Sequence, residues 1–231
     1  MNLLECQHIT KKFNNFKALD NVSITLKKGK VYGLLGPNGS GKTTLIKIIN
    51  NLLTKDTGTI LIKGKSNCLD SKNIIAYLPD TTYLDFNMTT TEVINYFKDF
   101  YADFRVNVAN KLLKELKIDT TKPLKKMSKG TKEKVELIMV MSRKAELYIL
   151  DEPIGGVDPA SREYIIKTIL DNFASNASIL ISTHLISDIE KILDEVIFLK
   201  DGKVLLQENC DELRSKENIS IDEIFREEFK C

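Results

Sequence analysis

A run of nine residues near the start of the chain has the residue types and spacing of a phosphate-binding loop. It reads Gly-Pro-Asn-Gly-Ser-Gly-Lys-Thr-Thr and fits the pattern G-x-x-x-x-G-K-[ST]. A loop that wraps a triphosphate must turn its backbone N–H groups inward, and side chains on its glycines would obstruct that approach. Lys42 would place a positive charge on the phosphates, and the Thr43 hydroxyl could join Mg²⁺. The residues expected to contact the nucleotide are Gly36, Pro37, Asn38, Gly39, Ser40, Gly41, Lys42, Thr43 and Thr44.

Two adjacent acids, Asp151 and Glu152, follow an apolar run that begins at Leu147. Such a run is typical of a buried parallel strand, and ligands bind where the carboxyl ends of these strands meet. Adjacent side chains on an extended chain point to opposite sides, so the two acids can take different roles. We expect Asp151 to face the Mg²⁺ shell and Glu152 to face the water that attacks the terminal phosphate. The alternative is that the pair simply ends a strand in a solvated turn.

The phosphate loop requires a strand before it and a helix after it, and the sequence predicts both. Residues 31–35 favour a strand, and the run from Thr43 to Leu53 favours a helix. Runs that alternate polar and apolar residues, as in an antiparallel sheet, cover Leu3 to Thr10, Val22 to Lys27 and Thr59 to Ile62. More continuously apolar runs, typical of a buried parallel sheet, begin at Val31, Ile74, Leu147 and Ile179.

Between about residues 86 and 143 the strand patterns give way to helical ones. Thr89 and Glu92 have the spacing of a capping box, which predicts that a helix begins there. An aromatic stripe at helical spacing is expected to be mainly core, although members left exposed would suit a helix of a partner protein. The stripe consists of Tyr96, Phe97, Phe100, Tyr101 and Phe104.

The C-terminal tail, about residues 214–231, is predicted to contain a short amphipathic helix. Ser220 and Glu223 have capping-box spacing, and apolar residues follow at Ile224 and Phe225. We expect this helix to fold back on its own domain, with contact to a second subunit or to a membrane subunit as the alternatives. The charged stretch before it is interpreted as a solvated linker.

The composition favours one compact unit in a reducing compartment. With 231 residues, 42% of them hydrophobic and 29% charged, the chain can bury a core. The net charge of +2 gives no sign of a nucleic-acid or lipid surface. No apolar run approaches the roughly 18 residues of a spanning helix, and no signal segment opens the chain. Four scattered cysteines predict no zinc site, and His8 is interpreted as structural.

In their order along the chain, these motifs resemble those of the ATP-binding cassette (ABC) ATPases, from residue 1 to about residue 213. The resemblance is to the nucleotide-binding subunit of a bacterial transporter, in an exporter-like branch with a Ser-Lys-Gly signature. It implies an α/β fold, with a P-loop ABC ATPase core that has a mixed, mainly parallel sheet, an N-terminal antiparallel β subdomain and a helical subdomain. Residues 1–231 would form this single ATP-binding domain, which would bind ATP and Mg²⁺.

The resemblance also implies roles for residues outside the loop. Phe13 matches the aromatic residue on which the adenine ring stacks. Glu152 matches the catalytic glutamate, and His184 the switch histidine that contacts the γ-phosphate. Asp158 lies in a Gly-Val-Asp-Pro segment that looks like the family's D-loop and would also contact nucleotide.

The signature sequence departs from the family pattern. In the family two cassettes meet head to tail, and each signature closes over the ATP of the other subunit. Where Leu-Ser-Gly-Gly-Gln is usual, this chain has Met-Ser-Lys-Gly-Thr, which keeps Ser128 and Gly130 as ATP-binding residues and adds a positive charge at Lys129. Ser128 would also serve as the N-cap of a helix from Lys129 to Ser142, a structural role compatible with the functional one.

A second departure lies at Asp80, where the family has the glutamine of its Q-loop. An ionised aspartate keeps an oxygen ligand for Mg²⁺ but loses the donor of the amide. We therefore count Asp80 with Thr43 and Asp151 as a metal-binding residue. The alternative is that Pro-Asp-Thr-Thr is only a favourable turn.

We therefore expect this chain to be the ATP-hydrolysing subunit of a bacterial ABC transporter. It would pair with a second ABC subunit, identical or different, and would drive a separately encoded membrane permease. Transport would run in the export direction. It would be cytoplasmic, peripheral on the inner face of the cell membrane, and would bind no nucleic acid. A helix of the permease would dock between the two subdomains, near Asp80 to Asn87, where cysteines placed at Tyr83 or Phe86 would cross-link to it. One alternative is a soluble ABC-family ATPase that acts on ribosomes or in DNA repair, and the presence of a single cassette argues against it. The other alternative is a sensory cassette that does not hydrolyse ATP, and Glu152 argues against it.

Overall fold

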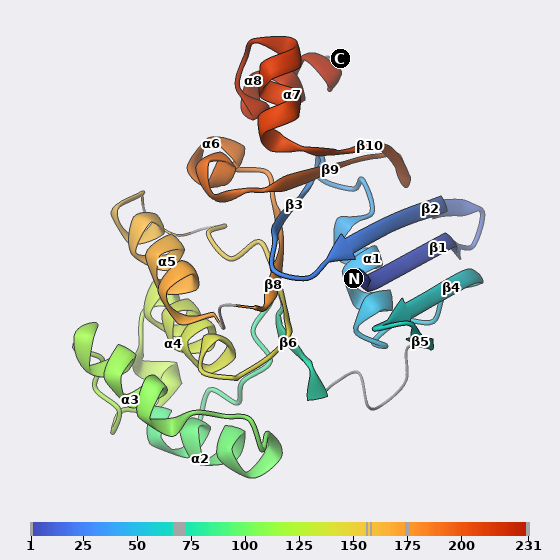
Figure 1. Cartoon of the computed structure of the whole chain (residues 1–231). Helices are drawn as coiled ribbons and strands as arrows, with labels where there is room; N and C mark the ends of the chain where they lie inside the picture. Colours follow the sequence, from blue (N-terminus) through green and yellow to red (C-terminus); the bar gives the residue numbers. More distant parts are fainter. Residues whose placement is uncertain (1, 67–72, 156, 158, 174–175, 230–231) are drawn as a thin grey trace.

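Two β-sheets and a group of helices form the chain, and the first helix lies between the sheets (Figure 1). The computed structural model describes residues 2–66, 73–155, 157, 159–173 and 176–229. One sheet is antiparallel and has the strand order β2-β1-β4-β5. Its strands are β1 (Asn2–Phe13), β2 (Phe16–Lys27), β4 (Thr57–Ile62) and β5 (Lys65–Ser66). The predicted early antiparallel strands are thus confirmed.

The second sheet has six strands in the order β10-β9-β3-β8-β7-β6. All neighbours in it are parallel except β10 and β9. Its strands are β3 (Val31–Leu35), β6 (Ile75–Leu78), β7 (Leu147–Asp151), β8 (Ser178–Thr183), β9 (Glu195–Lys200) and β10 (Lys203–Asn209). Every residue of β3, β7 and β8 is buried, because both faces of this sheet are covered. The predicted parallel sheet is confirmed, and β9 and β10 join it as strands that the apolar runs do not predict.

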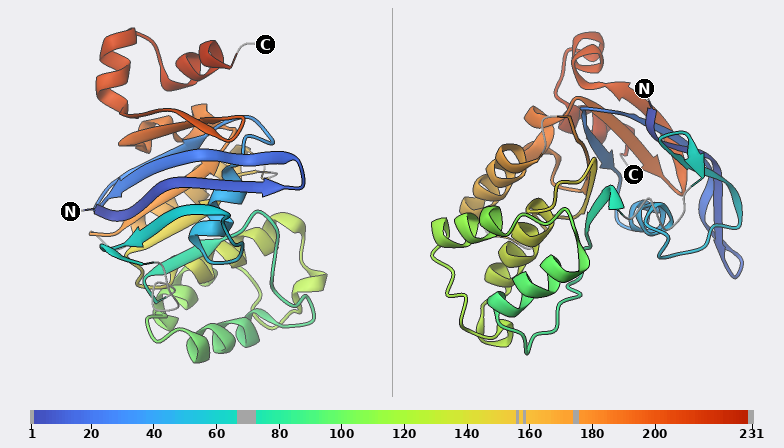
Figure 2. Two further views of the ribbon diagram at one scale, coloured as in Figure 1. Left: turned by 90° about the vertical axis from the view of Figure 1, so that its right-hand side faces the viewer. Right: turned by 60° about the horizontal axis from the view of Figure 1, so that its bottom comes forward.

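Helix α1 (Lys42–Ile49) follows the phosphate loop and packs between the two sheets. Its Leu45 side chain is buried in one cluster with Leu4 of β1 and Leu34 of β3. The opposite face of the six-stranded sheet is covered by helices that include α5 (Pro159–Asn172) and α6 (Ile186–Ile189), the latter followed by a 3-10 turn, η3 (Glu190–Ile192) (Figure 2).

Helix α1 is shorter than predicted. It ends at Ile49 rather than at Leu53. Asn50 is its C-cap, and Asn51 takes a left-handed backbone conformation with φ of 56°, which an α-helix cannot continue.

The region after β6 contains helices that share their own apolar core. They are α2 (Thr90–Phe100), α3 (Val106–Glu115), the 3-10 turn η2 (Leu124–Lys126) and α4 (Lys129–Met141). The capping box of Thr89 and Glu92 is confirmed. The aromatic stripe divides between the two expected roles: Phe97 is buried in this core, whereas Tyr96 and Phe100 are exposed and their ring centroids lie 4.5 Å apart.

The C-terminal tail packs on its own chain through α7 (Cys210–Glu217) and α8 (Ile221–Glu228). Ile221 is buried, and the ring of Phe225 meets that of Phe198 in β9 edge to face at 5.5 Å. The predicted amphipathic helix, its capping box and its folding back are confirmed. The linker interpretation of the charged stretch is wrong, because the Asn209 side chain caps α7 and the Arg214 guanidinium donates to the carbonyl of Glu190.

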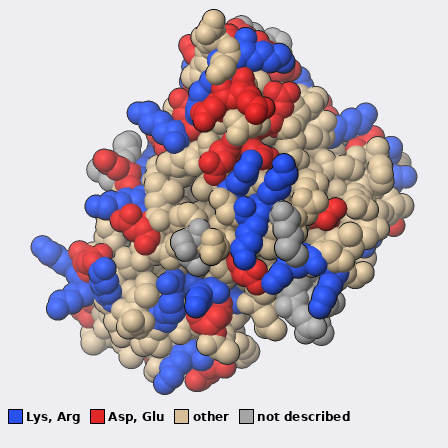
Figure 3. All heavy atoms as spheres, in the orientation of Figure 1, with Lys and Arg blue, Asp and Glu red and all other residues tan. Residues whose placement is uncertain are grey.

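None of the helices in the described part of the chain combines the length and the apolar character that a membrane span requires. Acidic and basic side chains are both spread over the face shown in Figure 3, and acidic ones gather near the C-terminal helices.

Helix α4 buries one carboxyl group within an otherwise apolar run of residues. Residues 135–141 are all buried, and Glu136 is the only charged residue among them, with 4% of its surface exposed. Its Oε1 atom has no hydrogen-bond partner among the described residues. Burial raises the pKa of Glu136 to about 7, and the charge of Glu133 adds to the rise. Between about pH 4.5 and pH 7, therefore, Glu136 keeps its proton in the folded protein, whereas the same carboxyl group is already ionised in the unfolded chain.

We expect Glu136→Gln to stabilise the protein progressively as the pH rises. Below the unfolded pKa both states of the wild type carry the proton and the substitution changes little. As the pH rises through the folded pKa, the wild type loses stability, so at pH 8 the variant should be more stable by up to about 3 kcal/mol, since one pKa unit corresponds to about 1.4 kcal/mol. Thermal unfolding between pH 5 and pH 8 measures the difference.

The matched control is Glu115→Gln, which removes the same charge from an exposed position on α3. Its stability difference from the wild type should stay small at every pH. A Glu136→Gln difference that did not grow with pH would contradict the raised pKa.

Candidate nucleotide-binding site

The carboxyl ends of three neighbouring parallel strands bring the separate motifs to one edge of the sheet. In the register of β3, β8 and β7, Leu35 pairs with Thr183 and Asp151 pairs with Ser182. The phosphate loop therefore leaves β3 at the same edge at which Glu152 follows β7 and His184 follows β8. Motifs more than a hundred residues apart in the sequence meet because β8 lies between the other two strands.

The phosphate loop has a backbone that only glycine permits at two of its positions. A Cβ atom at Gly36 would lie 2.3 Å from the carbonyl oxygen of Leu199. Gly41, the N-cap of α1, has φ of 106°, and a Cβ there would lie 2.5 Å from the carbonyl oxygen of Ala18. No side chain caps the N-terminus of α1, so the N–H groups of its first turn are left for an anion.

Lys42 is buried at the centre of this loop. Its Nζ donates to the carbonyl oxygens of Gly36 at 2.7 Å and Pro37 at 3.2 Å. Burial lowers the pKa of Lys42, and the negative charges of Glu152 and Asp151 act in the opposite direction. The ammonium group is thus held between the loop that would bind phosphates and the two acids at the end of β7, Asp151 and Glu152.

Asp151 has the surroundings of a ligand for a hard cation. Only 1% of its surface is exposed; its Oδ1 accepts a hydrogen bond from the Ser182 hydroxyl, and its Oδ2 has no partner among the described residues. Burial raises the pKa of Asp151, the hydrogen bond from Ser182 and the nearby hydroxyl of Thr43 oppose the rise, and the charges of Asp80 and Glu152 add to it. A buried carboxylate with an unpaired oxygen beside the Thr43 hydroxyl fits Mg²⁺.

The described residues contain no group of three or more His, Cys, Asp or Glu side chains that could hold a metal by themselves. Magnesium typically takes one or two carboxylates and completes its shell with water and substrate phosphates. Asp151 and Thr43 could supply the protein's part of such a shell.

Glu152 and His184 form a pair at the same edge. Glu152 Oε2 lies 3.0 Å from Nδ1 of His184. The Glu152 backbone has φ of 52°, a left-handed conformation that is costly for a residue with a side chain. Its amide N–H donates to the carbonyl oxygen of Ser182 at 3.0 Å, which holds this conformation.

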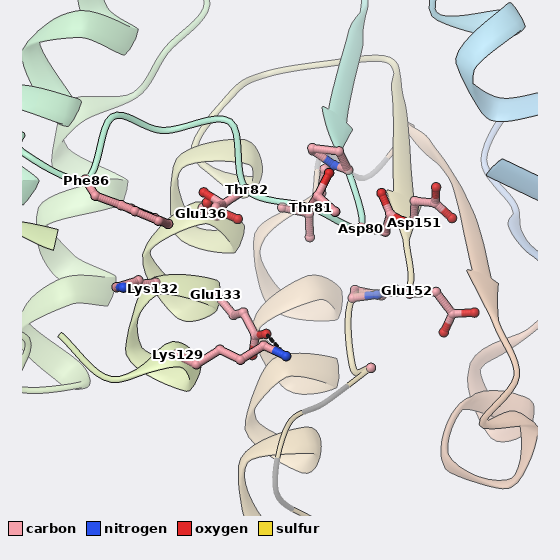
Figure 4. A pocket seen from close by; sticks show the side chains of 14 residues that line it. Asp80, Thr81, Thr82, Phe86, Lys129, Lys132, Glu133, Glu136, Asp151 and Glu152 are labelled. Carbon is pink, nitrogen blue, oxygen red and sulfur yellow. Dashed lines mark ion pairs between the residues drawn. The ribbon is translucent and has the colours of Figure 1, made fainter. Parts of the chain in front are cut away.

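Asp80 lies at the boundary of two cavities. The first, of about 400 Å³, is also lined by Glu136, Asp151 and Glu152 (Figure 4). The second, of about 430 Å³, has mainly apolar and aromatic walls. Residues 79–82 line both, so this short segment separates the nucleotide side from the second cavity.

The structure separates the two aromatic residues that the sequence places in one groove. Tyr83 lines the second cavity, whereas Phe86 lines the first, where the Lys132 ammonium lies 4.2 Å from its ring centroid. Contact of Tyr83 or Phe86 with a docked helix stays a prediction, and the two positions would report on different cavities.

Three further predicted site residues lie apart from the loop. Phe13 ends β1 with an exposed ring, 5.5 Å from the Lys11 ammonium. Ser128 is the N-cap of α4, accepting from the backbone N–H of Thr131, and Gly130 lies in its first turn. Within the described residues no hydrogen bond or ion pair joins these residues to the phosphate loop or to the two acids. Asp158 lies outside the described residues.

Two polar residues of the site carry no predicted role. Ser182 bonds Asp151, and its signal in the sequence is a hydroxyl at the end of an otherwise apolar strand. Glu136 lines the first cavity, and its signal is a single charge within the apolar half of α4. Both signals are weak, because an isolated polar residue in an apolar run does not reveal what it faces.

Known proteins resemble this chain over most of its length. The family model described as ABC transporter matches residues 19–155. The chain is 33% identical over 218 residues to the ABC transporter ATP-binding protein YtrB of Bacillus subtilis (strain 168), and the match covers 93% of this chain and 74% of that protein. It is 30% identical over 211 residues to the SkfA peptide export ATP-binding protein SkfE of the same strain, covering 89% of this chain and 88% of that protein.

A solved structure of the ATP binding subunit of an ABC transporter superposes on the chain with a TM-score of 0.87. The two are 28% identical, and the match covers 97% of this chain and 98% of the other. The resemblance to ABC transporter ATP-binding subunits and the α/β fold class are both confirmed, whereas the exporter-like branch with a Ser-Lys-Gly signature stays a prediction. With the phosphate loop, the two acids and the histidine gathered at one sheet edge, the chain belongs to the ABC transporter family as an ATP-binding domain.

Proposed function

We propose that this ATP-binding subunit hydrolyses ATP, with Glu152 and His184 as its catalytic residues. The observation that carries the proposal is the pair they form, 3.0 Å apart, beside the buried Lys42 of the phosphate loop. Glu152 would accept the proton of the attacking water, and His184 would hold that carboxylate and contact the γ-phosphate.

The remaining residues of the edge would bind the substrate. Residues 36–44 would surround the phosphates with backbone N–H groups, and the exposed ring of Phe13 would stack on the adenine. Asp151 and Thr43, with Asp80 at the rim of the first cavity, would hold Mg²⁺. When bound, this ion neutralises charge on the phosphate oxygens.

Gly130 supports an ATP-dependent dimer. A Cβ atom built at Gly130 would meet nothing within 4 Å, so its own fold leaves room for a side chain there. The close approach of another molecule would account for glycine at this position. Ser128 and Gly130 at the N-terminus of α4, together with Asp158, would meet the ATP bound to a second ABC subunit.

We expect Glu152→Gln to bind ATP without hydrolysing it and to accumulate as a dimer. The amide keeps the size of the side chain but cannot accept the proton of the attacking water, so the closed state persists. Light scattering with and without Mg-ATP measures the mass, and a phosphate-release assay should show a loss of at least about a hundredfold, the usual contribution of a general base.

Lys42→Ala is the control for nucleotide dependence. It removes the phosphate-binding ammonium group and should leave the protein monomeric at any ATP concentration tested. A Glu152→Gln variant that binds ATP but stays monomeric at saturation would argue against the head-to-tail dimer.

The second cavity is the proposed docking site for a helix of a separately encoded membrane permease. It opens between α1 and the helical region, and its rim exposes apolar side chains: Leu52 is 59% exposed and Tyr83 is 48% exposed. An apolar groove of this kind suits the apolar face of an amphipathic helix. Since residues 79–82 also line the first cavity, a helix docked there would contact the segment that carries Asp80.

A cysteine at Tyr83 is expected to cross-link to a membrane protein in native membranes, whereas a cysteine at Phe86 should cross-link several-fold less. Both residues are exposed aromatics on one short segment, but they line different cavities. Phe86→Cys is therefore a matched control for reactivity. Immunoblotting of membrane fractions after treatment with a short bifunctional thiol reagent measures the yield.

Combining Tyr83→Cys with Lys42→Ala should lower the yield if docking and ATP binding are coupled. Equal cross-linking from Tyr83 and Phe86 would place the partner elsewhere. Recovery of the protein only with ribosomes or DNA, and none with membranes, would favour the soluble alternative.

We further propose export of a peptide or another amphipathic compound, from the cytoplasmic face of the membrane. The name of SkfE, which describes a peptide export ATP-binding protein, supports this direction and cargo class. The relatives are ATP-binding proteins of transporters, so the sensory and soluble alternatives are not favoured.

A further inference from the structure

Ser182 lies where its side chain reaches both Asp151, the last residue of β7, and Glu152, which follows that strand. It is fully buried near the end of β8, opposite Leu34 of β3 on one side and Asp151 of β7 on the other. Alternate residues of a strand share a face, and Leu180 packs in the cluster that contains α1. Ser182 therefore lies on the side of the sheet from which Lys42 and Thr43 begin α1.

The hydroxyl of Ser182 makes two hydrogen bonds with two neighbouring acids. It donates to Oδ1 of Asp151 and accepts from the backbone N–H of Glu152 at 3.2 Å. A buried hydroxyl without partners would be destabilising, and a bond to a carboxylate is stronger than one between neutral groups. Both hydrogen-bonding capacities of the hydroxyl are thus used within the site.

These bonds decide what each acid can do. Because the hydroxyl holds Oδ1 of Asp151, the carboxylate is fixed in a rotation that leaves Oδ2 unpaired. The bond to the Glu152 amide supports the left-handed backbone that turns the Glu152 side chain toward His184. A single oxygen atom thereby links the orientation of the cation ligand to that of the catalytic carboxylate.

We propose that Ser182 is a positioning residue for the hydrolytic site, fixing Asp151 for Mg²⁺ and Glu152 for water through one hydroxyl. The inference rests on the proposed function. It concerns residues of this chain alone, and hydrogen-bonded groups around a cation ligand typically change metal affinity when removed. The Glu152 amide also bonds the backbone carbonyl of Ser182, so a variant without the hydroxyl keeps that contact.

The test is the Mg²⁺ dependence of nucleotide binding, measured with a fluorescent ATP analogue. In Ser182→Ala the half-saturating Mg²⁺ concentration should rise about tenfold, the lower end of the effect of such groups. Binding in the presence of a chelator should stay unchanged, because Lys42 and the loop are untouched. Ser182→Thr keeps the hydroxyl and should return the Mg²⁺ dependence close to the wild-type value, which a purely structural role would not require.

Ser178→Ala is the matched control. Ser178 is also fully buried on the same face of β8, but its hydroxyl donates to the carbonyl of Lys27 and accepts from the amide of Gly29, far from the acids. This variant should leave the Mg²⁺ dependence unchanged even if it lowers the melting temperature.

An unshifted Mg²⁺ dependence in Ser182→Ala, or an equal shift in Ser178→Ala, would overturn the inference. If Ser182→Ala does not fold, Ser182→Cys replaces the hydroxyl with a weaker donor of similar size. A wild-type Mg²⁺ dependence in Ser182→Cys would then overturn the inference as well. Nucleotide binding by the wild type that ignores Mg²⁺ would instead refute the proposed function.

Discussion

The parallel pairing of β8 between β3 and β7 is the constraint on which the rest of the structure depends. This register places Ser182 beside Asp151 and aligns the ends of all three strands. A slip of one residue would move every side chain of a strand to its other face and would separate the hydroxyl from the carboxylate. The apolar residues of the strands are buried on both faces, so the register is strongly specified by packing, and the site inherits its geometry from the core.

The site carries features that oppose stability. Lys42 and Asp151 are ionisable groups inside a protein core, and Glu152 holds a left-handed backbone. Each of these costs free energy unless a specific partner offsets it. The partners are the loop carbonyls for Lys42 and Ser182 for both acids. Such an arrangement is typical of a binding site whose remaining partner is a charged ligand.

The segment 79–82 connects this site to the surface. It forms a wall of the cavity that contains Asp151 and of the cavity that exposes Tyr83. A thin wall between two cavities cannot be displaced on one side without changing the shape of the other, because its backbone fills the space between them. This gives a direct physical route by which a helix docked in the second cavity would alter the surroundings of Asp80.

The sequence by itself determined the phosphate loop, the strand that ends in two acids, the two kinds of sheet and the capping boxes of α2 and α8. These features depend on local spacing, and local spacing is visible along the chain. Backbone turns and contacts between distant segments decided three other features. These are the length of α1, the helix that contains Arg214, and the placement of Tyr83 and Phe86 in different cavities. The same is true of Ser182 and Glu136, because the role of a buried polar side chain depends on which atoms the fold places around it, and no spacing along the chain records those atoms.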